Sequence, residues 1–464
     1  MSRNGHPKQP VSSSPTQTDP PAETWLLGML LVLLVAYLTP FFLSQELAVD
    51  GLVYANIAMR LAAGEGGLWS LPQFSGTDQV FTDHPPLGIY ALSLWMQWLG
   101  TSTPGVEKGF SAVLSLVVIA LIVVLARREQ RSGALPVLLF LCVPIATYTL
   151  KNNFLETQIC ILYLVACLAA LRAWSTPVWG IVVGLCALFG CLIKGPVGLL
   201  PLLIPAALWL QHRDLGRATL IGAIILGTLL LGAAILWYAV DGVARAAEFY
   251  WHKQVFASIT GERPVQHGRD YLLWHALVST AVMLAVALLV ARPSFVPRAS
   301  AAPGYQKFWG VMCLAALLPL LLSARHYRHY LLPVLPFMAL FISGWLTPHR
   351  WLLALYQWRG VIACACTALL LVQLVRHWDQ TGDRKADIEA AALLAQYVDD
   401  VAFCNDERVL HLRLYSYRLH RIRSRVDAAN PAEIVCATSP GPDYLSLQIL
   451  APGITLFARK DERR

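Results

Sequence analysis

An aspartate begins the first polar segment that follows a long apolar run. This segment, V-D-G-L-V-Y-A-N-I-A-M-R, contains Asp50 and continues with Ala55, Ala58 and Met59 at helical spacing. An aspartate at a helix start is, by position alone, more often a capping residue than a functional one. A carboxylate close to an acceptor hydroxyl can also serve as a general base, and Asp50 is therefore the first candidate for chemistry.

Four more polar segments carry acids or bases between apolar runs. Double prolines that start helices and lysines that extend from span ends are common without any function, so each segment also has a purely structural interpretation. The segments are F-T-D-H-P-P-L-G-I-Y with Asp83 and His84, K-N-N-F-L-E with Lys151 and Glu156, L-I-K-G-P-V-G with Lys194, and F-Y-W-H-K-Q-V-F with His252 and Lys253.

A fifth segment, S-A-R-H-Y-R-H-Y-L-L-P, is dense in positive charge. It contains Arg325, His326, Arg328 and His329 within five residues. Guanidinium forks and imidazoles suit a phosphate group. Several cations with a single clear acid favour a phosphate-bearing substrate and one general base over the paired carboxylates of a glycosidase.

The composition indicates that these polar segments belong to a membrane protein. The chain has 464 residues, of which 56% are hydrophobic and only 14% are charged, whereas about a quarter are charged in an ordinary soluble domain. A soluble enzyme, a disordered chain and a secreted disulfide scaffold are thereby excluded. The net charge of +8 is explained by basic membrane loops, and no nucleic-acid motif accompanies it.

Apolar runs long enough to cross a bilayer predict about eleven transmembrane helices. Residues 1–23 are rich in Ser, Pro, Thr and Gln and predict a disordered cytoplasmic tail. The stretch 86–99 is apolar but short, and its aromatic residues favour an interfacial helix. The predicted spans are 25–43, 108–126, 134–150, 157–173, 178–193, 196–210, 219–240, 271–291, 308–323, 330–346 and 359–375.

Basic loops fix the expected orientation. If 86–99 does not span and the N-terminus is cytoplasmic, nearly every basic cluster between spans falls inside, as the positive-inside rule requires. The segments 44–107, 151–156 and 241–270 and the tail from about 376 then lie outside. The dense cations of 323–333 also fall outside, against the rule, which favours a functional reason for them.

The C-terminal residues 376–464 predict a small extracytoplasmic α/β domain. Asp387–Val398 is amphipathic, and Val401–Cys404, Glu433–Ala437 and Ile454–Ala458 read as short strands. Cys404 and Cys436 lie in or beside two of these strands, in a compartment where disulfides persist. They are either bonded to each other or two buried thiols.

Together the polar motifs resemble the C-type (GT-C) membrane glycosyltransferases, specifically the bacterial relatives of protein O-mannosyltransferase and lipid A aminoarabinose transferase. The similarity covers roughly residues 25–350. The segment V-D-G-L-V-Y-A resembles the family's D-E-x-x-Y-A, with Gly51 in place of the usual second acid. The segments D-H-P-P-L-G, L-I-K-G-P-V-G and Y-R-H-Y-L-L-P-V-L-P are similar to the family's H-P-P, T-K-G-P-x-G and R-Y-L-L-P-x-L-P.

The resemblance implies transfer of a sugar from a polyprenyl-phosphate carrier to an acceptor at the extracytoplasmic face of the bacterial inner membrane. The acceptor would be lipid A or lipopolysaccharide, another glycan or a protein, and no nucleotide would be needed. It makes 24–375 the catalytic domain and Asp50 the catalytic residue. It further implies substrate-binding roles for Tyr54, His84, Lys151, Glu156, Lys194, Arg325 and Arg328, and a divalent-metal site at Asp83 and His252.

In the implied mechanism, Asp50 accepts the proton of the attacking acceptor oxygen, and cations hold the departing phosphate. We expect these cations to be His84, Lys151, Arg325 and Arg328. Two other function classes stay open. A transporter or flippase of an anionic lipid-sugar would also need exterior cations, but it predicts charged residues in broken mid-membrane helices. A scaffold subunit would leave Asp50 without a role.

Overall fold

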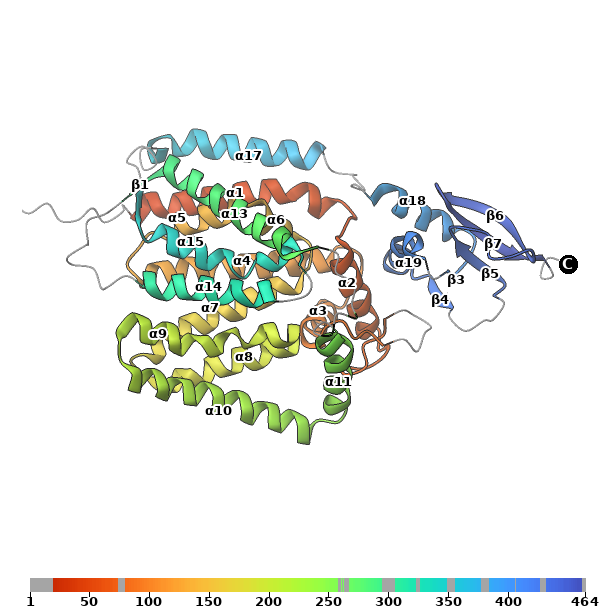
Figure 1. The fold of residues 1–464 in the computed structure, drawn as a ribbon. Helices are drawn as coiled ribbons and strands as arrows, with labels where there is room; N and C mark the ends of the chain where they lie inside the picture. The colour runs from red at the N-terminus through yellow and green to blue at the C-terminus, as the bar shows by residue number, and fades with distance from the viewer. Residues whose placement is uncertain are drawn as a thin grey trace, which may run out of the picture.

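The computed structural model describes residues 20–73, 80–257, 260, 262, 267–293, 305–322, 326–348, 355–376, 384–404, 406–425 and 431–460. Long helices lie side by side in a bundle, and a small mixed domain lies beyond one end of it (Figure 1). The bundle helices are α1 (Pro20–Leu43), α4 (Val106–Arg128), α5 (Ala134–Leu141), α6 (Pro144–Lys151), α7 (Leu155–Ala173), α8 (Gly180–Lys194), η2 (Gly195–Leu203), α9 (Ile204–His212), α10 (Leu215–Ala239), α13 (Arg269–Val290), α14 (Gln306–Leu322), α15 (Leu335–Ser343) and α17 (Arg359–Arg376).

Each predicted span contains at least one of these helices, so a polytopic helical membrane protein is confirmed. Within the described ranges, seven helical segments are long and apolar enough to cross a membrane. An eighth is added if α5 and α6, bent by 83°, form one span. The bend follows from Pro144, which cannot donate a helical hydrogen bond to the preceding turn.

One of the seven segments, Pro177–His212, folds back on itself. A Cβ placed on Gly198 would lie 2.1 Å from the carbonyl carbon of Gly190, although eight residues of a straight helix would separate the two by about 12 Å. The reversal occurs at Gly195, whose φ of 65° is a left-handed conformation, and at the proline that follows it. The total of about eleven crossings stays a prediction.

The predicted disordered tail extends too far along the chain. Residues 1–19 lie outside the described part, but α1 begins at Pro20, before the predicted start of the first span. Proline is tolerated at a helix start because its missing N–H would have no partner there. Glu23, in the first turn, accepts a hydrogen bond from the backbone N–H of Gly133 at 2.9 Å, which fixes this end of the helix.

Short helices cross the end of the bundle that faces the small domain (Figure 1). They are α2 (Val49–Ala62), α3 (Leu87–Trp98), α11 (Val243–Tyr250) and the π-helical turn η3 (Trp251–Phe256). The 12 residues of α3 extend about 18 Å, well short of the ~30 Å hydrocarbon core. The helix predicted at 86–99 is therefore too short to span.

The C-terminal domain is a five-stranded sheet in the order β4-β3-β5-β7-β6, packed against α18 and α19. Strand β3 is parallel to β4 and β5, whereas β7 is antiparallel to β5 and β6. The predicted α/β character is confirmed. The elements are α18 (Lys385–Leu394), β3 (Asp400–Phe403), α19 (Glu407–His420), β4 (Arg423–Arg425), β5 (Glu433–Cys436), β6 (Tyr444–Ala451) and β7 (Ile454–Arg459).

The remaining short elements connect these larger parts. They are the antiparallel pair β1 (Ala291–Pro293) and β2 (Leu346–Pro348), and the 3₁₀ turns η1 (Pro177–Trp179), η4 (Arg328–Leu331) and η5 (Leu355–Trp358).

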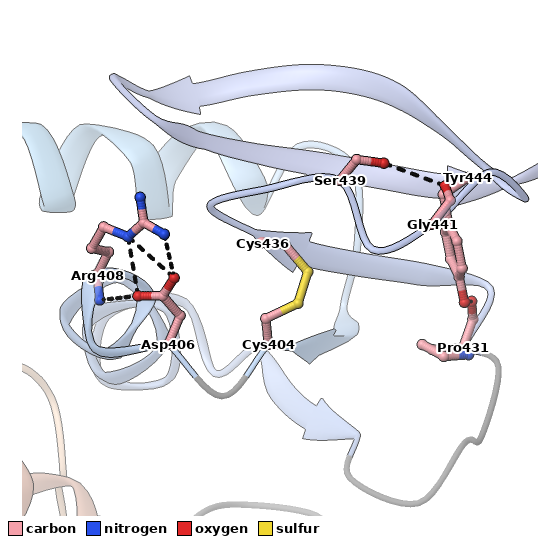
Figure 2. The surroundings of a disulfide bond; sticks show 8 residues. All are labelled: Cys404, Asp406, Arg408, Pro431, Cys436, Ser439, Gly441 and Tyr444. Carbon is pink, nitrogen blue, oxygen red and sulfur yellow. Dashed lines mark hydrogen bonds and ion pairs between the residues drawn. A yellow bond between two sulfur atoms is a disulfide. The ribbon is translucent and has the colours of Figure 1, made fainter.

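A disulfide joins two neighbouring strands of this domain (Figure 2). Cys404, directly after β3, is bonded to Cys436 at the end of β5, with their Cα atoms 5.1 Å apart. The strands bring the two cysteines together because β3 and β5 are parallel neighbours, and the Cys404 N–H donates to the Val435 carbonyl at 3.0 Å. Of the two alternatives left open by the sequence, the structure has the bonded one.

The small domain shares a hydrophobic core with the end of α1, the connection that follows it and α2. Phe41 at the end of α1, Leu47 in the connection, and Leu52 and Ala55 of α2 are buried in one cluster with side chains of α18, α19 and the sheet. The helix that carries Asp50 is therefore covered by the C-terminal domain on one side and by the bundle on the other.

Candidate active site

A cavity of 1220 Å³ lies where the bundle, α2 and the C-terminal domain meet. Its polar wall combines segments that are far apart in the sequence. Seven of the predicted site residues line it: Asp50, Tyr54, Asp83, His84, Glu156, Lys194 and Arg328. Motifs that are far apart in the sequence thus come together in one site.

Two carboxylates in the cavity face a shared histidine. His329 Nε2 lies 3.6 Å from Asp50 Oδ2 and 3.4 Å from Glu156 Oε1. The Glu156 carboxylate also forms a buried ion pair with the Lys194 ammonium. The Asp50 side chain is 47% exposed and that of Glu156 only 3%. Asp50 is therefore the carboxylate that a substrate can reach, and Glu156 serves as a counter-charge.

Aromatic rings hold His329 and Lys194 in place. Phe154 stacks on the His329 ring with centroids 4.4 Å apart and an angle of 9° between the planes. Tyr330 meets the same ring edge-on at 4.8 Å, and the Lys194 ammonium lies 4.2 Å from the Tyr330 ring centroid. Stacking and cation–π contacts of this kind restrict both side chains to a narrow range of positions.

Glycine and asparagine position Asp50 against the second acidic segment. The Ala48 N–H donates to Asn152 Oδ1 at 2.9 Å. A Cβ on Gly51 would lie only 1.9 Å from the Asn152 carbonyl oxygen, so this contact requires glycine. The turn continues through Asn153 at a φ of 55°, which asparagine tolerates better than most residues. The family's usual acid has no space at position 51.

We therefore expect Gly51→Ala to disrupt the site. The added methyl group must displace either α2 or the 152–153 turn, and we expect the activity of the site to fall at least tenfold, since small misplacements of reacting groups cost that much. This activity and the melting temperature of purified protein are the measurements. Gly109→Ala is the matched control, because nothing lies within 4 Å of a Cβ there. Equal behaviour of both variants would contradict the close-packing argument.

The K-G-P-V-G segment positions Lys194 at the end of α8. Gly195, in its left-handed conformation, ends the helix, and a Cβ there would lie 2.2 Å from the Tyr250 hydroxyl oxygen. Gly198 lets the chain return directly against Gly190. Both glycines are thus needed to turn the chain back and leave the lysine pointing into the cavity.

Two of the histidines in the cavity wall, His84 and His329, have pKa values well below the usual value for histidine. Burial lowers the pKa of His84 to about 3, and the nearby Lys194 charge lowers it further. Burial likewise lowers the pKa of His329 to about 4, although Glu156 partly opposes this. Burial of His84 thus favours its neutral form in the ligand-free site, because the charged form would be poorly solvated, and its role as a cation stays a prediction.

These depressed pKa values predict acid sensitivity. Unfolded histidines bind a proton below about pH 6.5, whereas the folded ones do not until pH 4 or lower. The unfolded state therefore binds more protons in this window, and stability must fall as pH decreases from 6.5 to 4. We expect the melting temperature to follow this trend and His329→Gln to flatten it. His252→Gln, at an exposed position, should keep the wild-type slope.

The predicted metal pair is not formed. Asp83 accepts a hydrogen bond from Gln254 Nε2 at 2.6 Å, whereas His252 is exposed and contacts Phe256. Residues 252 and 254 point differently because η3 is helical. Within the described ranges, no group of three or more His, Cys, Asp or Glu side chains could hold a metal ion. The geometry therefore gives no support to a metal role for Asp83 and His252.

The predicted phosphate-binding cations meet different outcomes. Arg328 is exposed at the cavity wall, with its guanidinium 4.4 Å from the Tyr148 ring centroid. Lys151 is not among the lining residues, and its ammonium lies 5.0 Å from the Phe41 ring centroid. The geometry gives no support to a phosphate contact of Lys151, because the end of α6 turns its side chain toward α1. Arg325 lies outside the described residues.

Some lining residues were not among the predicted ones. His329, Tyr330, Gln254, Arg269 and His411 all contribute to the wall. His329 could have been selected from the dense basic segment, where it directly follows Arg328. Gln254 and Arg269 carry no sequence signal that separates them from ordinary loop residues. His411 comes from the C-terminal domain, where no sequence pattern indicated a contact with the cavity.

Comparisons with known proteins agree with this geometry. The family model described as dolichyl-phosphate-mannose-protein mannosyltransferase matches residues 83–238. The crystal structure of ArnT from Cupriavidus metallidurans bound to undecaprenyl phosphate is 16% identical, with 94% of this chain and 98% of that chain covered and a TM-score of 0.66. The apo structure of the same protein is 15% identical at the same coverage, with a TM-score of 0.68.

A more distant similarity is to the archaeal oligosaccharyltransferase AglB from Archaeoglobus fulgidus. That structure is 13% identical and has a TM-score of 0.42, with 85% of this chain and 64% of that chain covered, which is too low to carry an argument. No curated protein matches the chain significantly. The family match, the ArnT similarity and the bundle with its interfacial helices lead to one conclusion: the chain has the fold of a C-type (GT-C) membrane glycosyltransferase.

Proposed function

We propose that this protein transfers a sugar from a polyprenyl-phosphate-linked donor to a cell-envelope acceptor. The acceptor is lipid A or lipopolysaccharide, another glycan or a protein. We place the reaction at the extracytoplasmic face of a bacterial inner membrane, with the N-terminus in the cytoplasm. The basic loops support this orientation, since the opposite one would put most of their charge outside.

The observation that carries the proposal is the position of Asp50. Its half-exposed carboxylate lies in a cavity that has a polar wall and an apolar wall. The apolar wall includes Ala316, Pro319 and Leu320 of α14, which suit a lipid chain. The polar wall offers Arg328 and Arg269 for a phosphate group. A donor with a lipid tail and a phosphate head fits this combination.

The proposed reaction uses Asp50 as the general base. The acceptor oxygen attacks the anomeric carbon of the sugar and forms the new glycosidic bond. As it does so, its proton passes to the Asp50 carboxylate. The bond between the anomeric carbon and the phosphate oxygen breaks, and its electrons leave with the polyprenyl phosphate. Cations at the wall stabilise that negative charge.

The function is tested first in cell envelopes and then with purified protein. Mass spectrometry of glycolipids and glycoproteins from cells with and without the gene should reveal one missing sugar modification. Purified protein should then move that sugar from its polyprenyl-phosphate carrier to the acceptor. If vesicles show movement of the lipid-sugar across the bilayer without any transfer, the protein is a flippase and the proposal is wrong.

Removal of an arginine should separate binding from chemistry. We expect Arg328→Ala to weaken binding of the donor about tenfold to a hundredfold, because one charge-assisted contact to phosphate is lost. Titration with the polyprenyl-phosphate donor measures this. Arg359→Ala is a matched control, since Arg359 is also exposed and lies 4.6 Å from a tyrosine ring, but outside the cavity lining. Unchanged donor affinity of Arg328→Ala would remove Arg328 from the phosphate site.

A further inference from the structure

The backbone that joins the first span to Asp50 forms hydrogen bonds with several distant parts of the molecule. This connection consists of residues 44–48 between α1 and α2. The Lys108 ammonium of α4 donates to the carbonyl oxygens of Phe41, at 2.6 Å, and of Ser44. Asn152 accepts from the Ala48 N–H at the other end, at 2.9 Å.

The middle of the connection is held by α19 of the C-terminal domain. Arg418 Nη1 donates to the Gln45 carbonyl at 2.6 Å. The Tyr415 hydroxyl accepts from the Leu47 N–H at 3.2 Å and lies 3.5 Å from the Leu47 carbonyl oxygen. These two residues are 368 positions or more from their partners in the sequence.

The cations in this arrangement are deeply buried. Arg418 is 1% and Glu107 0% exposed in their side chains, and the two form an ion pair. Lys108 is 2% exposed. The last carbonyls of α1 have no helical partners and carry partial negative charge, which the Lys108 ammonium satisfies at Phe41, while Arg418 satisfies the Gln45 carbonyl just beyond the helix. A buried charge is costly unless it is paired and hydrogen-bonded, so the arrangement holds its geometry firmly.

We propose that α19 is a positioning element for the catalytic base, with Tyr415 and Arg418 as its positioning residues. This rests on the proposed function of Asp50. Neither residue is among the described residues that line the cavity. Each acts through the backbone, since Leu47 lies three residues before Asp50 and one residue before Ala48, which precedes α2. Fixing these peptide groups fixes where the Asp50 carboxylate meets the acceptor.

Tyr415→Phe tests this with the smallest change. It removes the hydroxyl that bonds Leu47 but keeps the ring in the shared hydrophobic core. We expect kcat to fall about tenfold or more while donor KM and melting temperature stay close to wild type, because only the base is misplaced. Tyr444→Phe is the matched control. It removes a hydroxyl that donates to the Pro431 carbonyl at 2.8 Å in the same domain, and it should change neither kinetic constant.

Hydrogen exchange on a peptide covering residues 44–52 gives an independent readout. The Leu47 amide should exchange faster in Tyr415→Phe than in wild type, and no faster in Tyr444→Phe. Arg418→Lys is a second variant, since it keeps the charge beside Glu107 but not the fork that also reaches Gln45. We expect it to lower kcat in the same way.

The outcomes distinguish failure of the positioning role of α19 from failure of the proposed glycosyl transfer. Wild-type kcat in both Tyr415→Phe and Arg418→Lys would overturn the positioning role while leaving glycosyl transfer intact. Equal changes in kcat, KM and melting temperature would also overturn it, because they indicate a general structural role. If wild-type protein transfers no sugar at all, or if Asp50→Asn transfers it normally, the function or its base has failed first.

Discussion

Replacement of Asp50 by asparagine is expected to lower kcat for sugar transfer by about 10² to 10⁴, the range that a general base contributes. The side chain keeps its size and can still form hydrogen bonds near His329, which lies 3.6 Å from the carboxylate. Only the ability to accept the acceptor's proton is lost. Binding of the polyprenyl-phosphate donor should therefore remain at the wild-type level.

The measurement combines single-turnover transfer by purified protein with titration of the donor. Arg328→Ala should show the opposite pattern, with weaker donor binding and a smaller change at saturating donor. A flippase needs no base at the outer surface, so loss of transfer in Asp50→Asn also separates an enzyme from a transporter. Near-normal transfer by this variant would overturn the assignment of Asp50.

The second large effect concerns the buried pair of Glu156 and Lys194. Their side chains are only 3% and 9% exposed. Lys194→Met leaves the Glu156 carboxylate buried without its ammonium, and removal of one partner of such a pair costs about 3–5 kcal/mol. We expect this single variant to accumulate poorly or to melt far below wild type.

The double variant Lys194→Met/Glu156→Gln should recover the fold, because no unpaired charge remains. It should stay inactive, since the cavity wall then lacks both the Lys194 ammonium and the Glu156 carboxylate. Lys253→Met is the control: Lys253 is exposed and lies 4.3 Å from the Phe249 ring centroid, so its loss should leave the melting temperature unchanged. A double variant that melts as low as the single one would show that packing, rather than charge, sets the cost.

Much of the architecture could be predicted because the bilayer imposes a strong pattern on a sequence. Apolar runs of about 20 residues identify helices without any knowledge of their neighbours, and each predicted run contains a helix. The strands that flank Cys404 and Cys436 followed from their local composition. Asp50 and Tyr54 could be placed together from the sequence because their motif is contiguous and lies on one short helix.

The features that could not be predicted depend on the orientation of individual side chains and on contacts between residues far apart in the sequence. Lys151 and His252 were in the expected segments, but the turn of a helix decides which side chain enters a cavity, and at η3 it is Gln254. Helix α19 was not predicted, because it is buried on several sides between the sheet and α2 and so lacks a single apolar face. The ion pair between Arg418 of α19 and Glu107 of α4 links residues 311 positions apart.

The contacts between α19 and residues 44–48 also have a consequence for how the protein is made. The ribosome synthesises Leu47 long before Tyr415, since 368 residues separate them. A nascent chain can insert its early spans while the segment before Asp50 still lacks its cover. The segment before Asp50 can reach its final shape only after the last part of the polypeptide has been synthesised and has folded. Chains that end prematurely would therefore reach the membrane without an ordered backbone before Asp50.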